Sequence, residues 1–232
     1  MKRFFLLICC CLCMVASGSY AQNKQTAEYD WDAKMKELGL TDVCFWEPSI
    51  QYHLVYATAD NFLKKPLYNS KLTKAWLHPH AAIKLIHAQE LLQKERPDLA
   101  LLIYDAARPV EVQRVMADWA KRTNNLYFVA DPSKGGGGQH NFGMAVDVTL
   151  VSDNGEWLPM GTPFDFIGLD AHTDKEDDLV KRRRITPSEY NNRRLLRQVM
   201  EAAGFTSITT EWWHFNACSR EEANKKYKLI DR

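Results

Sequence analysis

One short stretch constrains the fold of this chain more than any other, residues 135–150 with the sequence GGGGQHNFGMAVDVTL. Four glycines lead into His140, and Asp147 follows inside a run of apolar and β-branched residues that is typical of a buried strand. A carboxylate in such a strand is costly unless a partner compensates its charge. The glycines let the backbone turn sharply and approach a ligand closely. The stretch therefore predicts a central strand with a bound partner at Asp147.

Apolar periodicity predicts the remaining elements. Helices are expected over 78–98, from Pro109 onward and over 187–205, and strands within 43–62 and over 99–109, 142–151 and 207–217. Because helices and strands are mixed without strict alternation, the pattern favours an α+β fold. We expect a single domain with a mostly antiparallel central sheet flanked by helices. The charged segment 174–184 is expected to be a solvated loop.

The N-terminus is typical of a secretory signal peptide, with two basic residues, an apolar run and small residues ending at Ala21. It is too short and too weakly flanked for a membrane anchor. A lipoprotein is the alternative, but the cysteines there do not follow the small residue that lipid attachment prefers. We therefore expect an exported, periplasmic protein with a signal peptide (1–21), an N-terminal leader (22–42) and one main domain (43–232).

The charge balance limits the binding partners to be expected, and the cysteine content limits the possible disulfides. The 30 Lys and Arg residues nearly balance the 29 Asp and Glu residues, for a net charge of +1. This balance predicts no nucleic-acid partner and no membrane contact beyond the signal peptide. After signal removal only Cys44 and Cys218 remain, and they are either a disulfide or two small buried side chains. The sequence leaves that choice and the oligomeric state open.

Titratable residues beside the apolar strands indicate a catalytic metal site. Two histidines and one carboxylate, His140, Asp147 and His214, make a three-ligand set that leaves one tetrahedral position open, as in catalytic zinc sites. Glu211 could take a proton from a metal-activated water and return it to a departing amine. Arg108, just after a strand, could stabilise a developing oxyanion or hold a carboxylate.

Each residue also has an ordinary structural explanation, and the spacing raises an objection. Asp147 could cap a turn, and Glu211 could pair with an arginine. Residues three or seven apart in a regular strand face opposite sides of the sheet. His140 can join Asp147 only from the turn before the strand, and Glu211 can join His214 only if the backbone bends near Trp212. We predict both irregularities.

The motifs DAARP, HNFGMAVD and EWWHF together resemble the zinc D-alanyl-D-alanine dipeptidases of the VanX type. The wider group includes D,D-carboxypeptidases, murein endopeptidases and the hedgehog signalling domain. The likeness continues through LPMGTPFDF and NNRRLLRQVMEAAGF and covers residues 43–216. It implies one zinc ion per chain on the three ligands, with Glu211 as base and acid and Arg108 at the oxyanion.

The resemblance also implies substrate contacts. Asp165 matches a position near the free amine of the substrate, and Tyr56 is expected to line the pocket. One departure concerns Gly138, because the family usually has a serine there and a hydroxyl is therefore missing. Fine specificity depends on that position.

The expected function is hydrolysis of D-Ala-D-Ala or a closely related D,D-dipeptide outside the inner membrane. One alternative is a murein D,D-carboxypeptidase or endopeptidase that acts on peptidoglycan stem peptides. The other is a zinc-containing binding module without turnover. Cell-wall turnover, salvage and antibiotic resistance all remain open as physiological roles.

Overall fold

The computed structural model describes residues 28–133 and 135–232, so the predicted signal peptide (1–21) lies outside the described residues. The helices are α1 (Trp31–Glu37), α2 (Val43–Trp46), α3 (Pro79–Glu95), α4 (Val110–Thr123), α5 (Glu176–Lys181), α6 (Pro187–Ala202) and α7 (Arg220–Lys226). The strands are β1 (Thr41–Asp42), β2 (Gln51–Tyr52), β3 (Trp76–Leu77), β4 (Leu99–Asp105), β5 (Ala145–Ser152), β6 (Thr206–Ser207) and β7 (His214–Asn216). Short 3₁₀ helices are η1 (Val55–Ala57), η2 (Gln139–Phe142), η3 (Leu169–Ala171) and η4 (Thr173–Lys175).

Five strands of the described chain form the main sheet, in the order β2-β4-β5-β7-β6. β2 pairs with β4 in parallel, whereas the β4–β5, β5–β7 and β6–β7 pairs are antiparallel. β1 and β3 form a separate antiparallel pair. The predicted α+β fold with a mostly antiparallel central sheet is therefore confirmed.

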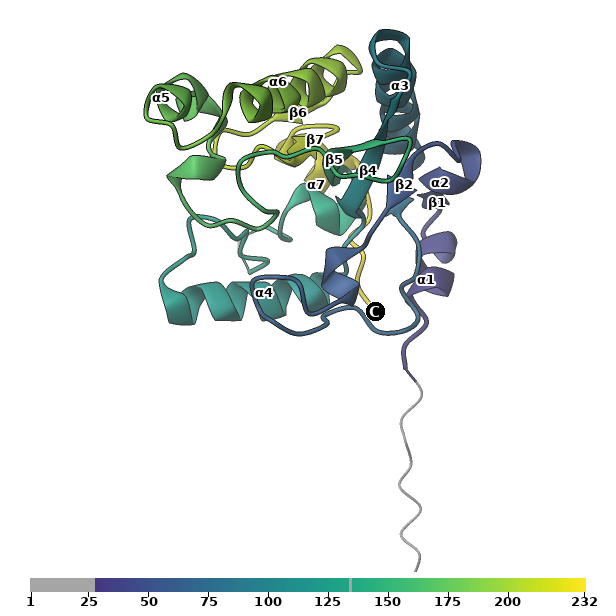
Figure 1. Ribbon diagram of the computed structural model, residues 1–232. Coiled ribbons are helices and arrows are strands. Elements are labelled where there is room, and N and C mark those ends of the chain that lie inside the picture. Colours follow the sequence, from purple (N-terminus) through teal and green to yellow (C-terminus); the bar gives the residue numbers. More distant parts are fainter. Residues whose placement is uncertain (1–27, 134) are drawn as a thin grey trace, which may run out of the picture.

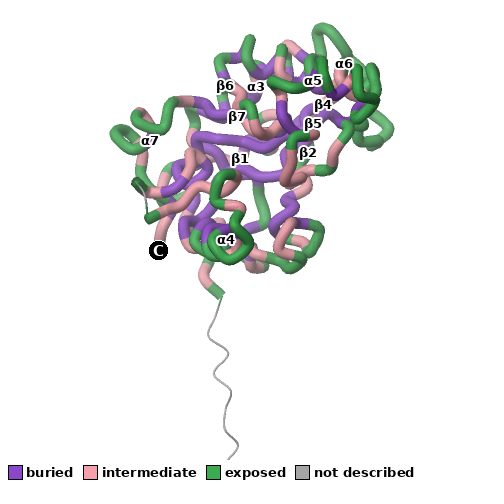
Figure 2. Tube along the Cα trace, turned by 90° about the vertical axis from the view of Figure 1, so that its left-hand side faces the viewer, coloured by how far each residue is buried: buried purple, intermediate pink, exposed green. Residues whose placement is uncertain are grey.

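Helices lie on both sides of this sheet (Figure 1). α3 and α6 contact each other and pack against β4, β5 and β6, while α4 lies on the opposite side. The two long strands, LALLIYD in β4 and AVDVTLVS in β5, are buried almost throughout. Strands covered on both faces are continuously apolar rather than alternating, as these sequences are. Figure 2 shows the buried segments gathered at the sheet between the helical layers.

Local signals position the helices close to their predicted limits. α3 begins with Pro79 after the N-cap residue His78, and α6 begins with Pro187 inside a capping box formed by Thr186 and Glu189. The segment 43–62 differs from the single predicted strand. It folds into α2, the two-residue strand β2 and η1, so the prediction is correct only for β2.

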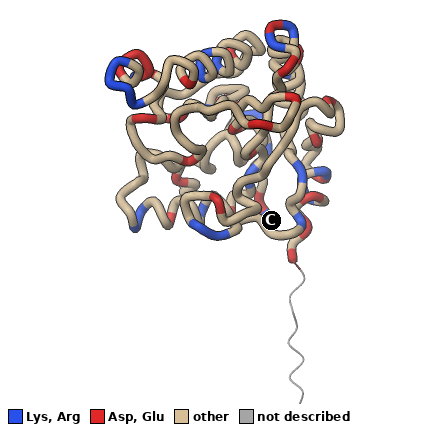
Figure 3. The backbone as a smooth tube through the Cα atoms, viewed as in Figure 1, with Lys and Arg blue, Asp and Glu red and all other residues tan. Residues whose placement is uncertain are grey.

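The prediction that 174–184 is a solvated loop is wrong, because Glu176–Lys181 forms α5. Three acidic residues occupy its first turn, where the helix dipole favours negative charge. Glu176 is only 3% exposed and pairs with Arg197 of α6, with Nη2 and Oε2 2.6 Å apart. A partner on another helix thus orders a segment that looked fully solvated from its charges. Figure 3 shows basic and acidic residues close together at this corner and interspersed elsewhere.

The described part of the predicted leader belongs to the packed domain. Trp31 and Met35 of α1 are buried in the same hydrophobic core as β4 and β5. The two remaining cysteines, Cys44 and Cys218, are free, so the disulfide alternative is not realised. Burial raises the pKa of the Cys44 thiol to about 12, which makes it an inert thiol. Among the described helices, none is both long and apolar enough to cross a membrane.

Candidate active site

Three potential metal ligands meet at the centre of the sheet. Asp147 lies in β5 directly opposite His214, the first residue of β7, and His140 lies in η2 just before β5. Trp212 and Trp213 form a turn, so Glu211 is outside the regular strand. Both predicted irregularities are therefore confirmed. They remove the objection that the spacing would place these side chains on opposite faces.

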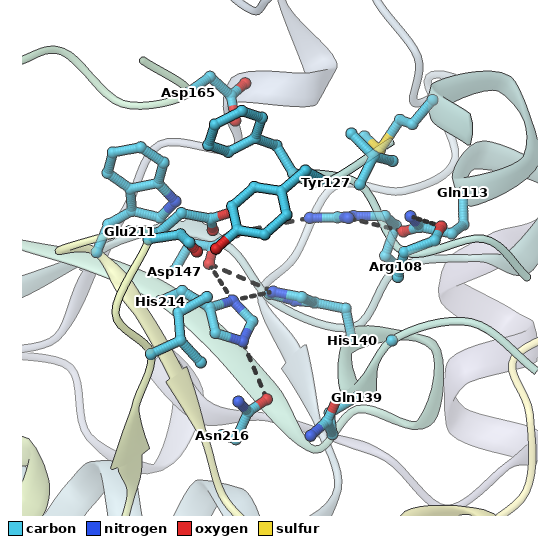
Figure 4. A pocket seen from close by; sticks show the side chains of 18 of the residues that line it. Arg108, Gln113, Tyr127, Gln139, His140, Asp147, Asp165, Glu211, His214 and Asn216 are labelled. Carbon is cyan, nitrogen blue, oxygen red and sulfur yellow. Dashed lines mark hydrogen bonds and ion pairs between the residues drawn. The ribbon is translucent and has the colours of Figure 1, made fainter. Parts of the chain in front are cut away.

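The three donor atoms form a compact triangle (Figure 4). The distances are 3.2 Å from His140 Nε2 to His214 Nδ1, 2.9 Å from His214 Nδ1 to Asp147 Oδ1, and 3.3 Å from His140 Nε2 to Asp147 Oδ1. Ligands bound tetrahedrally at zinc distances of about 2.0–2.1 Å lie about 3.3 Å from one another. The triangle therefore has the size that a tetrahedral ion requires.

The outer hydrogen bonds of the histidines fix which ring nitrogens can bind a metal. His140 Nδ1 lies 2.7 Å from the carbonyl oxygen of Ala106, and His214 Nε2 lies 3.0 Å from Oδ1 of Asn216. Both oxygens can only accept, so each of these nitrogens carries the hydrogen. In neutral rings the inward nitrogens then present lone pairs to each other and to a carboxylate. Three converging acceptors call for a cation, and the site fits a metal ion.

Asp147 is the anionic member of this set. Burial alone would raise its pKa, but the positive charge and N–H donors of protonated His140 and His214 outweigh burial and hold the pKa of Asp147 below its usual value. When the rings are neutral and bind a metal, the cation would supply this stabilisation instead. The other oxygen of Asp147, Oδ2, lies 3.5 Å from Nη2 of Arg108. Asp147 thus directs Oδ1 to the two histidines of the metal site and Oδ2 to the guanidinium of Arg108. This answers what compensates the aspartate in the apolar strand.

Asn216 gives a testable consequence of the outer hydrogen bonds. Asn216→Ala is expected to weaken metal affinity by about 10–100-fold, because His214 loses the acceptor that orients its ring. Competition with a chromophoric chelator measures this affinity. Asn191→Ala, at an exposed position of α6, is the matched control and should bind metal like the unaltered protein. Equal affinities for all three proteins would show that Asn216 does not hold the ligand.

Arg108 is fixed at the cavity wall by a buried network. Its guanidinium donates to Asp105 through Nε at 2.8 Å and also through Nη2, and Nη1 donates to Gln113 at 2.8 Å. A register irregularity in the β4–β5 ladder places Asp105 opposite Asp147. Burial opposes the positive charge, but the negative groups around it, of which Asp105 contributes most, together outweigh burial and hold the pKa of Arg108 above its usual value. The arginine is thus permanently charged and preoriented.

Glu211 lines the same cavity without a strong ion pair among the described residues. Desolvation by the surrounding side chains raises the pKa of its carboxyl to about 7, and nearby Asp147 adds to this rise. A carboxyl with a pKa near neutrality can both accept and return a proton at physiological pH. Glu211 therefore has the properties that a general base and acid needs.

The raised pKa of Glu211 makes a prediction for the metal-free protein. A folded-state pKa of about 7, above the ordinary 4.5, means that folding favours the protonated carboxyl. The associated stability is present below pH 4.5 and is lost as the pH rises through about 7. Glu211→Gln should therefore raise the thermal midpoint of the metal-free protein at pH 8 and change it little at pH 4.5. A thermal scan with equal shifts at both values would contradict this assignment.

Asp165 and Tyr56 form a second polar pair in the cavity. The hydroxyl of Tyr56 donates to Asp165 Oδ1 at 2.9 Å, and its ring lies 4.9 Å from Cζ of Arg108. Asp165 Oδ2 is buried and has no hydrogen-bond partner among the described residues. Burial raises the pKa of Asp165 to about 7. Its backbone also has a φ of +61°, in the left-handed region that few residues other than glycine, asparagine and aspartate adopt.

All seven predicted site residues line one cavity of about 540 Å³, within the usual size range of ligand sites. Gln113 and Met116 place this cavity between α4 and the sheet. Tyr127 also lines it, and Figure 4 shows its ring extending across the front of Asp147 and Glu211 although the residue is 75% exposed. Sequence reasoning missed Tyr127, because a loop residue carries no periodic signal.

Two other contributors had a readable signal. Asn216 lies two residues after His214, so it shares a strand face with that ligand. Asp105 is the first residue of the DAARP motif, to which the sequence alone assigns no role. Its position three residues before the arginine lets the turn after β4 bring the two side chains together. Neither role was assigned because neither residue is itself a ligand or a base.

A His-Asp-His triangle with a carboxylate and an arginine in one cavity defines the site of a metal-dependent hydrolase. Residues 36–230 match the Peptidase M15 family, described as D-Ala-D-Ala dipeptidase, and the chain belongs to this family of metallopeptidases. The resemblance expected from the motifs is confirmed.

Three relatives are similar over most of their length. The D-alanyl-D-alanine dipeptidase of Escherichia coli (strain K12) is 32% identical over 176 residues, which cover 76% of this chain and 83% of that protein. The protein of the same name from Enterococcus faecium is 32% identical over 198 residues, covering 77% and 91%. The one from Enterococcus faecalis (strain ATCC 700802 / V583) is 29% identical over 201 residues, covering 78% and 87%.

Proposed function

We propose that this protein hydrolyses D-Ala-D-Ala, or a closely related D,D-dipeptide, with zinc as its resident metal. Family membership supports the substrate class, and two imidazoles with one carboxylate suit zinc. The observation that carries the proposal is Asp165 Oδ2, a buried oxygen without a partner in the cavity of the metal ligands. The ammonium group of a dipeptide, one residue from the scissile bond, supplies the charge and the donors that this oxygen lacks.

The residues of the chain then divide the reaction among them. A zinc ion held by the triangle would supply Lewis acidity toward the scissile carbonyl and the attacking water. Glu211 removes one proton from that water as its oxygen bonds to the carbonyl carbon. Glu211 then returns the proton to the departing nitrogen as the C–N bond breaks. One dipeptide and one water thus give two molecules of D-alanine.

Arg108 is the candidate for stabilising charge on the carbonyl oxygen. Asp105 and Gln113 account for three of its five N–H donors, so donors remain for an oxygen of the substrate. The bonds to Asp105 prevent the guanidinium from swinging away. A fixed donor acts without reorganisation at the moment when charge develops, which is the most effective form of electrostatic catalysis.

Asp165→Asn tests the ammonium contact. The substitution keeps the shape of the side chain and its bond from Tyr56 but removes the charge. We expect KM for D-Ala-D-Ala to rise by about 10–100-fold, the effect of losing one hydrogen bond to a charged group, with a smaller change in kcat. Asp153→Asn, at an exposed position beyond β5, is the matched control and should leave both constants unchanged. An unchanged KM in Asp165→Asn would remove the ammonium assignment.

Chain-length preference tests the dipeptidase proposal itself. Release of D-alanine from D-Ala-D-Ala is compared with release from a stem pentapeptide, using the same zinc-loaded protein. We expect the dipeptide to be much the better substrate, because the longer peptide has an acyl group where Asp165 would bind an ammonium. Release only from the pentapeptide would instead indicate a murein D,D-carboxypeptidase. Zinc binding without release from either would indicate a binding module.

We also propose that the protein is exported and acts in the periplasm, on the basis of the signal-like sequence at its N-terminus. The test is expression of the whole chain in a Gram-negative host, followed by fractionation and N-terminal sequencing. The expected result is a periplasmic protein that begins at residue 22. A cytoplasmic protein that retains residues 1–21 would contradict export.

A further inference from the structure

Arg193 of α6 is a buried cation that the proposed reaction does not use. It is 1% exposed, and no carboxylate of the described residues forms an ion pair with it. Its Nη1 atom has no hydrogen-bond partner among the described residues. Burial lowers the pKa of Arg193 to about 10, although nearby carboxylates, Glu176 first among them, oppose this shift.

The bonds of Arg193 join the two ends of one loop. Its Nε donates to the carbonyl oxygen of Met160 at 2.6 Å, and its Nη2 donates to that of Asp170 at 3.0 Å. These carbonyls bracket residues 160–170, called here the 160–170 loop, and Asp165 lies at its middle. The rigid fork of a guanidinium can bond both carbonyls at once, which an ammonium group on a flexible stem does poorly. Arg193 therefore fixes both ends of the segment that carries Asp165.

The same side chain contacts the turn that carries Glu211. Cζ of Arg193 lies 5.8 Å from the centre of the Trp212 ring, and Trp212 follows Glu211 directly. The indole Nε1 of Trp212 donates to Oγ1 of Thr162 at 2.8 Å, inside the 160–170 loop. The 160–170 loop, the turn at Trp212 and α6 thus contact one another through the guanidinium of Arg193 and the indole of Trp212.

Gly161 shows how closely the 160–170 loop approaches α6. A Cβ atom at this position would lie 2.5 Å from Cγ2 of Ile185 and 3.3 Å from Nη2 of Arg193. Gly161 also has a φ of +83°, which disfavours other residues. Three motifs of the sequence meet at this contact. Gly161 and Thr162 come from LPMGTPFDF, Arg193 from NNRRLLRQVMEAAGF and Trp212 from EWWHF. Apart from His214, these motifs supply no metal ligand.

We infer that Arg193 is a positioning residue: it holds the 160–170 loop against the turn at Trp212 and thereby fixes Asp165 relative to Glu211. Arg193 does not line the cavity and acts only through these two segments. The inference rests on the proposed function, in which Asp165 receives the ammonium group and Glu211 moves the proton. It explains how Asp165 keeps its left-handed backbone conformation with one side-chain oxygen unpaired among the described residues.

A double-mutant cycle tests this inference. Arg193→Lys keeps a positive charge but loses the fork, and Asp165→Asn removes the group that the fork positions. We expect Arg193→Lys alone to lower kcat/KM for D-Ala-D-Ala by about 10–100-fold, mainly through KM, as small misplacements do. When Asp165→Asn is already present, Arg193→Lys should lower kcat/KM by about twofold or less, because the carboxylate that Arg193 positions has already been removed. Equal losses in both backgrounds, or no loss at all, would overturn the inference.

Amide hydrogen exchange gives a readout that does not depend on activity. Arg193→Lys should speed exchange in the 160–170 loop and leave β5 unchanged, whereas a general loss of stability would speed both. Arg194→Lys, at an exposed neighbouring position, is the matched control and should change neither exchange nor kinetics. If Arg193→Lys does not fold, Thr162→Val should give the same pattern more weakly, because it removes the bond from Trp212.

These readouts separate the inference from the proposed function. If the unaltered protein does not hydrolyse the dipeptide, the proposed function fails, and the positioning of Asp165 for that substrate fails with it. The exchange measurement still decides whether Arg193 holds the loop. If the unaltered protein is active but exchange and kinetics are the same in Arg193→Lys, only the inference about Arg193 fails.

Discussion

Glu211→Gln is expected to lower kcat for D-Ala-D-Ala by about 10²–10⁴-fold while KM and metal content stay nearly unchanged. Glutamine has the same shape as glutamate but cannot accept a proton from water. Glu211 is not part of the His140–Asp147–His214 triangle, so its replacement leaves the metal ligands in place. Steady-state kinetics, together with metal analysis of the purified variant, measure both parts of the prediction.

The control for this experiment is Glu90→Gln, the same chemical change at an exposed position of α3. It should retain full activity. A Glu211→Gln variant that retains its metal and remains within a few-fold of the unaltered protein would exclude Glu211 as the base. A variant that loses metal as well would show instead that Glu211 supports the ligand site.

Loss of a metal ligand is expected to have the second large effect. His140→Ala removes one of three donors whose mutual distances already match a tetrahedral ion. Metal should fall well below one equivalent per chain, and kcat/KM should fall by about 10³-fold or more, since a metal supplies several kcal/mol to the transition state. Adding a chelator to the unaltered protein should produce the same loss, and adding zinc back should restore activity.

Stability gives an independent check on the same site. A ligand present at about 1,000 times its dissociation constant stabilises the folded protein by about 4 kcal/mol. For a domain of this size that corresponds to a rise of about 10 °C in thermal midpoint. His140→Ala should lose most of this zinc-dependent rise, whereas His87→Ala, at an exposed position of α3, should retain it. Equal zinc-dependent stabilisation in the two variants would rule out His140 as a ligand.

The central strands and the metal-site residues could be predicted from the sequence, because apolar runs, proline and capping residues mark these elements locally. The apolar strand around Asp147 is buried on both faces, and a buried carboxylate there had to have a partner. The alternation rule for strands even predicted the two backbone irregularities that bring His140 and Glu211 into the site. Proline and capping residues gave the start of α3 and α6 within a residue or two.

The parts that were not predicted depend on contacts between distant segments. α5 is ordered by the pair of Glu176 with Arg197, and charge composition alone could not show that partner. Arg193 bonds two carbonyl groups that lie 33 and 23 residues away in sequence, and an arginine in an amphipathic helix ordinarily faces water. The roles of Tyr127 and Asn216 likewise depend on where the chain places a loop and a strand end relative to the metal ligands.

The most direct test of the account is a zinc titration of the metal-free protein, with D-alanine released from D-Ala-D-Ala as the readout. The account predicts that activity rises linearly and reaches a plateau at one zinc per chain. In His140→Ala no such break point should be seen. Release of D-alanine that does not depend on added metal, or zinc bound at one equivalent with no release, would contradict a zinc-dependent dipeptidase centred on His140, Asp147 and His214.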